Sequence, residues 1–135
     1  MIKARIATAM FVLILGALVP TARAQILPCP RGMSSNDACD QWQFEQADKE
    51  LAAIVELALT AIDSFAHPNT LQEAKERLTQ GHRLWGQRRE VDCQAESAFV
   101  WLRSARTREG YTSVCMRDLT VRRIAELKKR YLLPY

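Results

Sequence analysis

Apolar residues recur at intervals of three and four over most of the chain. Between Asn36 or Asp37 and about Phe65, this spacing places them on one face of an α-helix. The small polar residues at 34–37 can cap the start of that helix. The sequence therefore predicts a first helix with an inward stripe made of Phe44, Ala47, Leu51, Ile54, Val55, Ala58, Ile62 and Phe65.

A second helix is predicted after Pro68, which disfavours helical geometry at the residue before it. Thr70 and Glu73 form a capping box, so the helix is expected from about Leu71 to Ala98. Gly81 and Gly86 inside it indicate a close helix contact or a bend. The residues expected near one side are Leu71, Ala74, Leu78, Trp85 and Ala95.

A third helix is expected from about Tyr111 to Arg130, after a turn between Arg103 and Gly110. Its inward residues are Met116, Thr120, Ile124, Leu127 and Tyr131. No segment alternates apolar and polar residues as a strand would. The predicted fold is all-α: an antiparallel three-helix bundle with two disulfides and a short cysteine-tethered N-terminal lead-in.

Two of the inward stripes carry a cysteine beside polar residues. Trp85, Arg89 and Cys93 follow at four-residue steps, so they lie on one helix face. Cys115, Thr120, Arg123 and Leu127 form the matching stripe of the third helix. We expect Asp48 on the first helix to meet Arg89 and Arg123, because an Asp–Arg cluster would fix the helix register.

The first 24 residues have the pattern of an export signal. Lys3 and Arg5 precede an apolar run at 10–19, and Ala22 and Ala24 form a small-x-small cleavage site. We therefore expect cleavage near Ala24, a mature domain at 25–135, and a periplasmic or secreted protein that does not span the membrane. The mature chain is long enough for one modest core.

All four cysteines lie in the mature part, and an even number in an exported chain indicates two disulfides. Two pairings fit the predicted turns. Cys29–Cys39 with Cys93–Cys115 is favoured, and the alternative pairs Cys39 with Cys93. The close C-x-x-C spacing typical of zinc sites does not occur, so no metal is expected.

Charge separates the two halves of the mature chain. Loss of Lys3, Arg5 and Arg23 lowers the net charge from +4 to +1, which gives no reason to expect nucleic-acid binding. Residues 25–100 carry 7 basic and 12 acidic side chains, whereas residues 101–135 carry 9 and 3. Asp37, Asp40 and Glu45 are therefore candidates to contact a basic partner. Neutralisation by the basic third helix is the other interpretation.

Patterns typical of catalysis do not occur: the chain has no phosphate-binding glycine loop, metalloprotease histidine pair or nucleophile elbow. No cofactor is expected, and the protein is not predicted to be an enzyme. Trp42, Trp85 and Trp101 are candidates for an aromatic platform that binds sugar. The inward stripe assigns Trp85 to the core instead.

Taken in order, several of these elements resemble the LprI family of lysozyme-inhibitor-like exported bacterial proteins. The resemblance rests on Cys29 and Cys39, Ala47-Asp48-x-Glu50-Leu51, Trp85-x-x-x-Arg89-x-x-x-Cys93, and Cys115-x-x-x-x-Thr120-x-x-Arg123-x-x-x-Leu127. Ala52 departs from the asparagine frequent in the family. Only Gly110 stands where the family has paired glycines.

The resemblance implies an exported, disulfide-bonded helical domain that inhibits lysozyme by protein–protein contact. Asp37, Asp40 and Glu45 would then face a basic lysozyme and obstruct its cleft. The alternative is a non-inhibitory envelope module that binds a periplasmic protein or peptidoglycan. The sequence assigns no oligomeric state.

Overall fold

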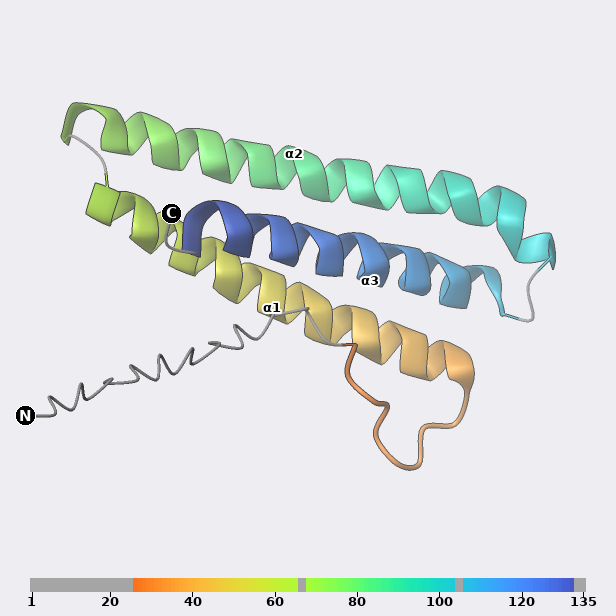
Figure 1. The fold of residues 1–135 in the computed structure, drawn as a ribbon. Coiled ribbons are helices and arrows are strands. Elements are labelled where there is room, and N and C mark those ends of the chain that lie inside the picture. The colour runs from red at the N-terminus through yellow and green to blue at the C-terminus, as the bar shows by residue number, and fades with distance from the viewer. Residues whose placement is uncertain (1–25, 66–67, 104–105, 133–135) are drawn as a thin grey trace, which may run out of the picture.

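The computed structural model describes residues 26–65, 68–103 and 106–132. Figure 1 shows three long helices lying side by side. No strand occurs in these ranges, and the predicted all-helical bundle is confirmed. The elements are α1 (Asn36–Phe65), α2 (Pro68–Val100), the 3-10 turn η1 (Trp101–Arg103), α3 (Arg108–Leu127) and the π-helical segment η2 (Lys128–Leu132).

Helix α2 runs antiparallel to its two neighbours, so α1 and α3 are parallel to each other (Figure 1). Ser113 donates a hydrogen bond to Gln41 at 2.8 Å near the start of both helices. Further along, Lys128 donates to Glu50, also at 2.8 Å. Helix α1 packs more extensively on α3 than on α2. The most extensive packing is therefore between two helices separated in the sequence by all of α2.

The apolar core is supplied unequally by the three helices. Burying one leucine or isoleucine contributes about 1.5–3 kcal/mol, so helix α1 supplies most of this stabilisation. Helix α2 supplies one buried apolar residue of this cluster, Leu78, and other contacts must hold the helix in place. The buried cluster consists of Leu51, Ile54, Val55, Ala58, Leu78, Ile124 and Leu127.

The beginning of α2 differs from the prediction. The helix begins at Pro68 rather than after a capping residue at Thr70. Proline suits the first helical position because its fixed φ is helical and no N–H is needed there. Proline therefore begins α2, in addition to ending α1.

The inward face of α2 also differs from the prediction, because Ala95, which was expected on that face, is exposed. At 3.6 residues per turn, Ala95 is rotated about 80° away from Trp85. Cys93 and Ser97 are the buried residues in this part of the helix.

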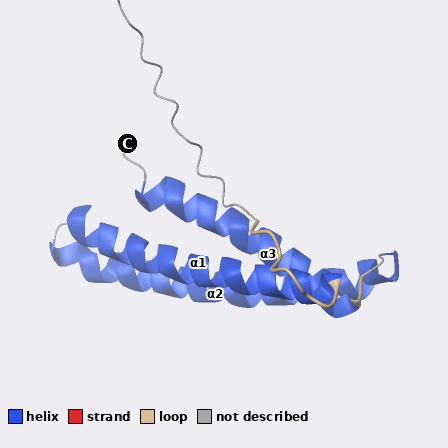
Figure 2. Ribbon diagram, turned by 90° about the horizontal axis from the view of Figure 1, so that it is seen from below, coloured by secondary structure: helices blue, strands red, loops and turns tan. Residues whose placement is uncertain are grey.

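Both disulfides lie toward the same end of the bundle. They join Cys29 to Cys39 and Cys93 to Cys115, with a Cα–Cα distance of 5.6 Å in each. The favoured pairing is confirmed, and the Cys39–Cys93 alternative is wrong. The lead-in is fixed to α1 a second time, because the Gln43 side chain donates to the Leu27 carbonyl at 2.7 Å. Figure 2 shows the lead-in passing across the helices.

The first turns of α1 and α3 meet at Gly110. Thr107 caps α3 by accepting a hydrogen bond from the Gly110 N–H at 3.1 Å, so α3 begins at Arg108, three residues earlier than predicted. The Asp37 carboxylate accepts the Thr107 N–H at 3.4 Å. A carboxylate is favoured there because two helix N-termini converge on it. A Cβ atom on Gly110 would overlap the Asp37 side chain.

Glycine is therefore required at 110 and not at 86. We expect Gly110→Ala to lower the free energy of unfolding by about 1–3 kcal/mol, because Asp37 must leave its place. Gly86→Ala is the matched control. Nothing lies within 4 Å of its added Cβ, so better helix propensity should raise stability by up to about 1 kcal/mol. Urea denaturation of both variants measures the difference.

The steric origin of the Gly110→Ala effect is tested in an Asp37→Ala background. Removing the carboxylate removes the overlap, so the cost of Gly110→Ala should fall toward zero or reverse. An equal cost in both backgrounds would contradict the proposed contact.

Candidate functional site

Arg89 connects all three helices. It projects from α2, and one guanidinium nitrogen donates to Asp48 Oδ1 on α1 at 2.6 Å and to Thr120 Oγ1 on α3 at 2.7 Å. Thr120 is fully buried and donates its own hydroxyl hydrogen to the Met116 carbonyl at 2.7 Å. The Arg89 side chain is 12 % exposed and that of Asp48 is 48 % exposed. The expected Asp48–Arg89 contact is present.

Aromatic rings enclose the same guanidinium. The Arg89 group lies 5.1 Å from the ring centroid of Phe44 and 5.0 Å from that of Trp85. Arg123 lies over Trp85 at 5.8 Å, but it pairs with Glu126 at 3.2 Å rather than with Asp48. Arg123 thus joins the cluster through the tryptophan ring and not through the acid. These contacts fix the helix register and occupy the groups that would otherwise bind a ligand.

His82 stacks on one residue of this cluster, Trp85. Its ring lies 6.1 Å from the Trp85 centroid at an interplanar angle of 15°. Burial lowers the pKa of His82, and the positive charges of Arg123 and Arg89 lower it further, against the opposing effect of Asp48. The imidazole therefore loses its proton more readily than an ordinary histidine does. Its Nδ1 atom is buried and makes no hydrogen bond to the described residues.

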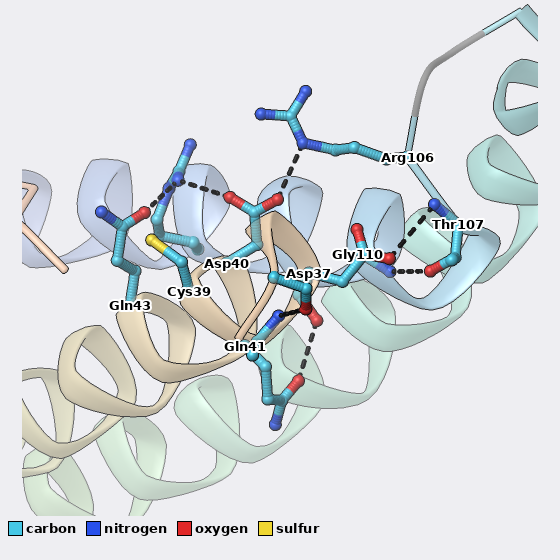
Figure 3. Close-up of polar contacts among 12 residues, drawn as sticks. Asp37, Cys39, Asp40, Gln41, Gln43, Arg106, Thr107 and Gly110 are labelled. Carbon is cyan, nitrogen blue, oxygen red and sulfur yellow. Dashed lines mark hydrogen bonds and ion pairs between the residues drawn. The ribbon is translucent and has the colours of Figure 1, made fainter. Parts of the chain in front are cut away.

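Asp40 was expected on the outward face of α1, but its side chain is only 6 % exposed. One carboxylate oxygen accepts from Arg106 Nε at 2.7 Å, and the other lies 3.7 Å from Arg117 (Figure 3). The hydrogen bond to Asp40 raises the pKa of Arg106. Gln43 accepts a further hydrogen bond from Arg117 at 2.6 Å. Asp40 therefore fastens α1 to α3 and to the residues before it, and its side chain is buried rather than outward.

The other acids of α1 divide into paired and exposed groups. Asp48, Glu50 and Asp63 pair with Arg89, Lys128 and Lys75. Neutralisation within the molecule therefore involves α2 as well as α3. Asp37 is half-buried beneath Gly110. Glu45 is exposed and accepts a hydrogen bond from Gln41 at 3.0 Å. Of the three predicted contact residues, Glu45 is the one on the surface.

An open groove of about 710 Å³ lies between α1 and α2. Its lining is polar and of mixed charge, and the Asp63–Lys75 ion pair crosses from one helix to the other. Over the described ranges, no group of three histidine, cysteine or acidic side chains is arranged to hold a metal ion.

Apolar side chains are exposed where α2 passes into η1. Phe99 is 76 % exposed, Leu102 71 % and Trp101 38 %. Of these residues, the sequence pattern identified only Trp101, as a candidate for a sugar platform. Phe99 and Leu102 belong to no inward helical stripe, so helical periodicity does not single them out. The sequence does contain a signal for this exposed patch. An apolar run stands directly before the predicted turn, where no predicted helix could pack against it.

The described residues thus form a small all-helical protein held together by two disulfides and by ion pairs between helices. Residues 29–127, well over half of the chain, match the family described as lysozyme inhibitor LprI. The chain belongs to this LprI family. No curated protein and no solved structure matches it.

The disulfides and the family together suggest an extracytoplasmic protein. Within the described residues, no helix has the length and hydrophobicity needed to cross a membrane. The predicted signal peptide lies outside the described residues.

Two adjacent arginines provide a test of the cluster. We expect Arg89→Ala to lower the free energy of unfolding by about 2–3 kcal/mol, because it leaves buried Thr120 and half-exposed Asp48 without their partner. Arg88→Ala is the control. Arg88 pairs with Asp92 on the open surface, so its loss should cost under about 0.5 kcal/mol. Chemical denaturation measures both. Equal costs would contradict the assigned role of Arg89.

His82 should make stability depend on pH. Because its folded pKa lies below the ordinary value of 6.5, the unfolded chain binds the proton more tightly. Stability is therefore present above pH 6.5 and is lost as the pH falls below it. We expect His82→Gln to reduce this loss in urea denaturation between pH 7.5 and 5.5. The parent protein is the reference, and a His82→Gln profile identical to that of the parent would refute the assignment.

Proposed function

We propose that this protein is exported and inhibits lysozyme by binding it. The observation that carries the proposal is the match of residues 29–127 to a family described as lysozyme inhibitor. Members of this family are inhibitors rather than enzymes by that description. The proposed export places the mature protein, from about residue 25, in the compartment where lysozyme attacks peptidoglycan.

The polar residues support a binding role for the surface. Contacts within the bundle use the hydrogen-bonding groups of Asp40, Asp48 and Arg89. These residues stabilise the arrangement of the helices, so exposed side chains would make the contact with another protein. We propose that exposed Glu45, with the half-buried Asp37 nearby, adds local attraction for a basic lysozyme. The mature net charge of about +1 would provide little attraction by itself.

A lysis assay tests this function directly. Purified residues 25–135 with both disulfides formed should slow the lysis of bacterial cells by an animal-type lysozyme, increasingly as the protein concentration rises. Binding that obstructs the cleft predicts this dependence. Lysis is followed as the fall in turbidity. Unchanged lysis at a large molar excess against several lysozymes would refute the proposal.

Two further measurements in this system separate the parts of the proposal. Retention on peptidoglycan, or co-purification with an envelope protein, without any effect on lysozyme would favour the alternative envelope module. Glu45→Gln should weaken inhibition if Glu45 attracts the lysozyme. An unchanged inhibition constant would remove Glu45 from the proposal.

A further inference from the structure

One end of the bundle presents large apolar side chains to solvent. They belong to the hairpin tip, which we define as Phe99, Trp101, Leu102 and Arg103, all exposed. The end of α2 and the η1 turn extend beyond the first turn of α1 (Figures 1 and 2). Single exposed leucines are ordinary on protein surfaces, but a cluster of apolar side chains at a protruding end is typical of a binding site.

The framework on both sides of this tip is held firmly. Cys93 and Cys115 join α2 to α3 below the tip. Tyr111 adds a hydrogen bond to Glu96 at 3.0 Å between the same helices. On the far side, Arg106 is fixed to buried Asp40 on α1 (Figure 3). Side chains presented by a framework that is already held lose less conformational entropy on binding, so these fastenings favour affinity at the tip.

The chemistry of the tip indicates the kind of surface it fits. Tryptophan and arginine are enriched among residues that dominate binding energy. Arg103 and Arg108 are exposed on either side of the turn and give this end positive charge. The complement is a concave surface that accepts apolar groups and carries carboxylates. A lysozyme cleft has that character, since it accommodates sugar rings and carries two catalytic carboxyl groups that flank the scissile bond.

We propose that the hairpin tip is the part of this protein that enters the lysozyme cleft. The apolar side chains occupy space that the sugar rings of the substrate would fill, and Arg103 lies toward the carboxylates. This inference rests on the proposed function and adds the contacting surface. A contact made only by Glu45 and Asp37 of α1 would be different, because it would cover the cleft from outside without entering it.

Leu102→Asp and Leu84→Asp form a matched test. Both leucines are exposed, at 71 % and 50 %, and they are separated by about 27 Å if the helical rise is continued between them. We expect Leu102→Asp to raise the inhibition constant more than tenfold, and Leu84→Asp to change it less than twofold. Thermal unfolding followed by circular dichroism should give the same midpoint for both variants.

Competition with a tri-N-acetylglucosamine oligosaccharide locates the contact on lysozyme. Saturating oligosaccharide should weaken binding of the parent protein to lysozyme at least tenfold. Suppose that Leu102→Asp loses inhibition but the oligosaccharide does not compete with the parent protein for lysozyme. That result would overturn the placement of the tip in the cleft. Equal inhibition by the two variants would overturn the role of the tip while leaving the proposed function standing.

The remaining outcomes also decide between the two proposals. A parent protein that neither binds nor inhibits lysozyme overturns the proposed function, and this inference with it. Sedimentation that shows a dimer of the parent, a monomer of Leu102→Asp, and unchanged inhibition would assign the tip to contact with a second copy. That result overturns the inference alone.

Discussion

The contact made by Arg89 is the constraint on which the arrangement of the helices depends. Helix α2 contributes one residue, Leu78, to the buried apolar cluster, so burial alone holds it weakly against the parallel pair α1 and α3. Arg89 compensates by bonding to Asp48 on one helix and Thr120 on the other. Because such bonds are directional, they specify one register, whereas apolar contacts tolerate sliding. The Cys93–Cys115 bond then fixes the same helix to α3 one turn beyond Arg89.

Parallel packing of α1 and α3 brings two helix N-termini together, and their partial positive charges repel each other. The negative charges of the acids at the start of α1 offset this repulsion. Asp37 accepts a backbone N–H of Thr107, and Asp40 binds the side chains of Arg106 and Arg117. Part of the opposite charge of the two halves of the chain is therefore used in internal packing. This explains why a strongly acidic first helix offers less surface for a partner than its composition indicates.

The two proposals follow from the same division between interior and surface. Polar groups that could have formed a site are used to hold helices together, while Phe99 and Leu102 are left in solvent at the end where both disulfides lie. An exposed apolar tip on a rigid framework suits binding to a concave surface, because little freedom remains to be lost. In the two proposals, the family described as lysozyme inhibitor suggests the partner, and the exposed tip is the surface proposed to contact it.

Much of the fold was determined by sequence alone. Periodicity gave the α1 core from Ala47 to Ala58, and the cysteine positions gave the favoured pairing, because both signals depend on local spacing. The inward position of Arg89 was also predictable. Tertiary structure decided that Asp40 is buried, that Arg123 meets Trp85 instead of Asp48, and that Gly110 has no room for a side chain. The burial of Asp40 and the lack of room at Gly110 depend on how α3 lies against α1, and the Arg123–Trp85 contact depends on how α3 lies against α2. The α1–α3 contact joins residues some 70 positions apart, and helical periodicity reports only which face of a helix is apolar.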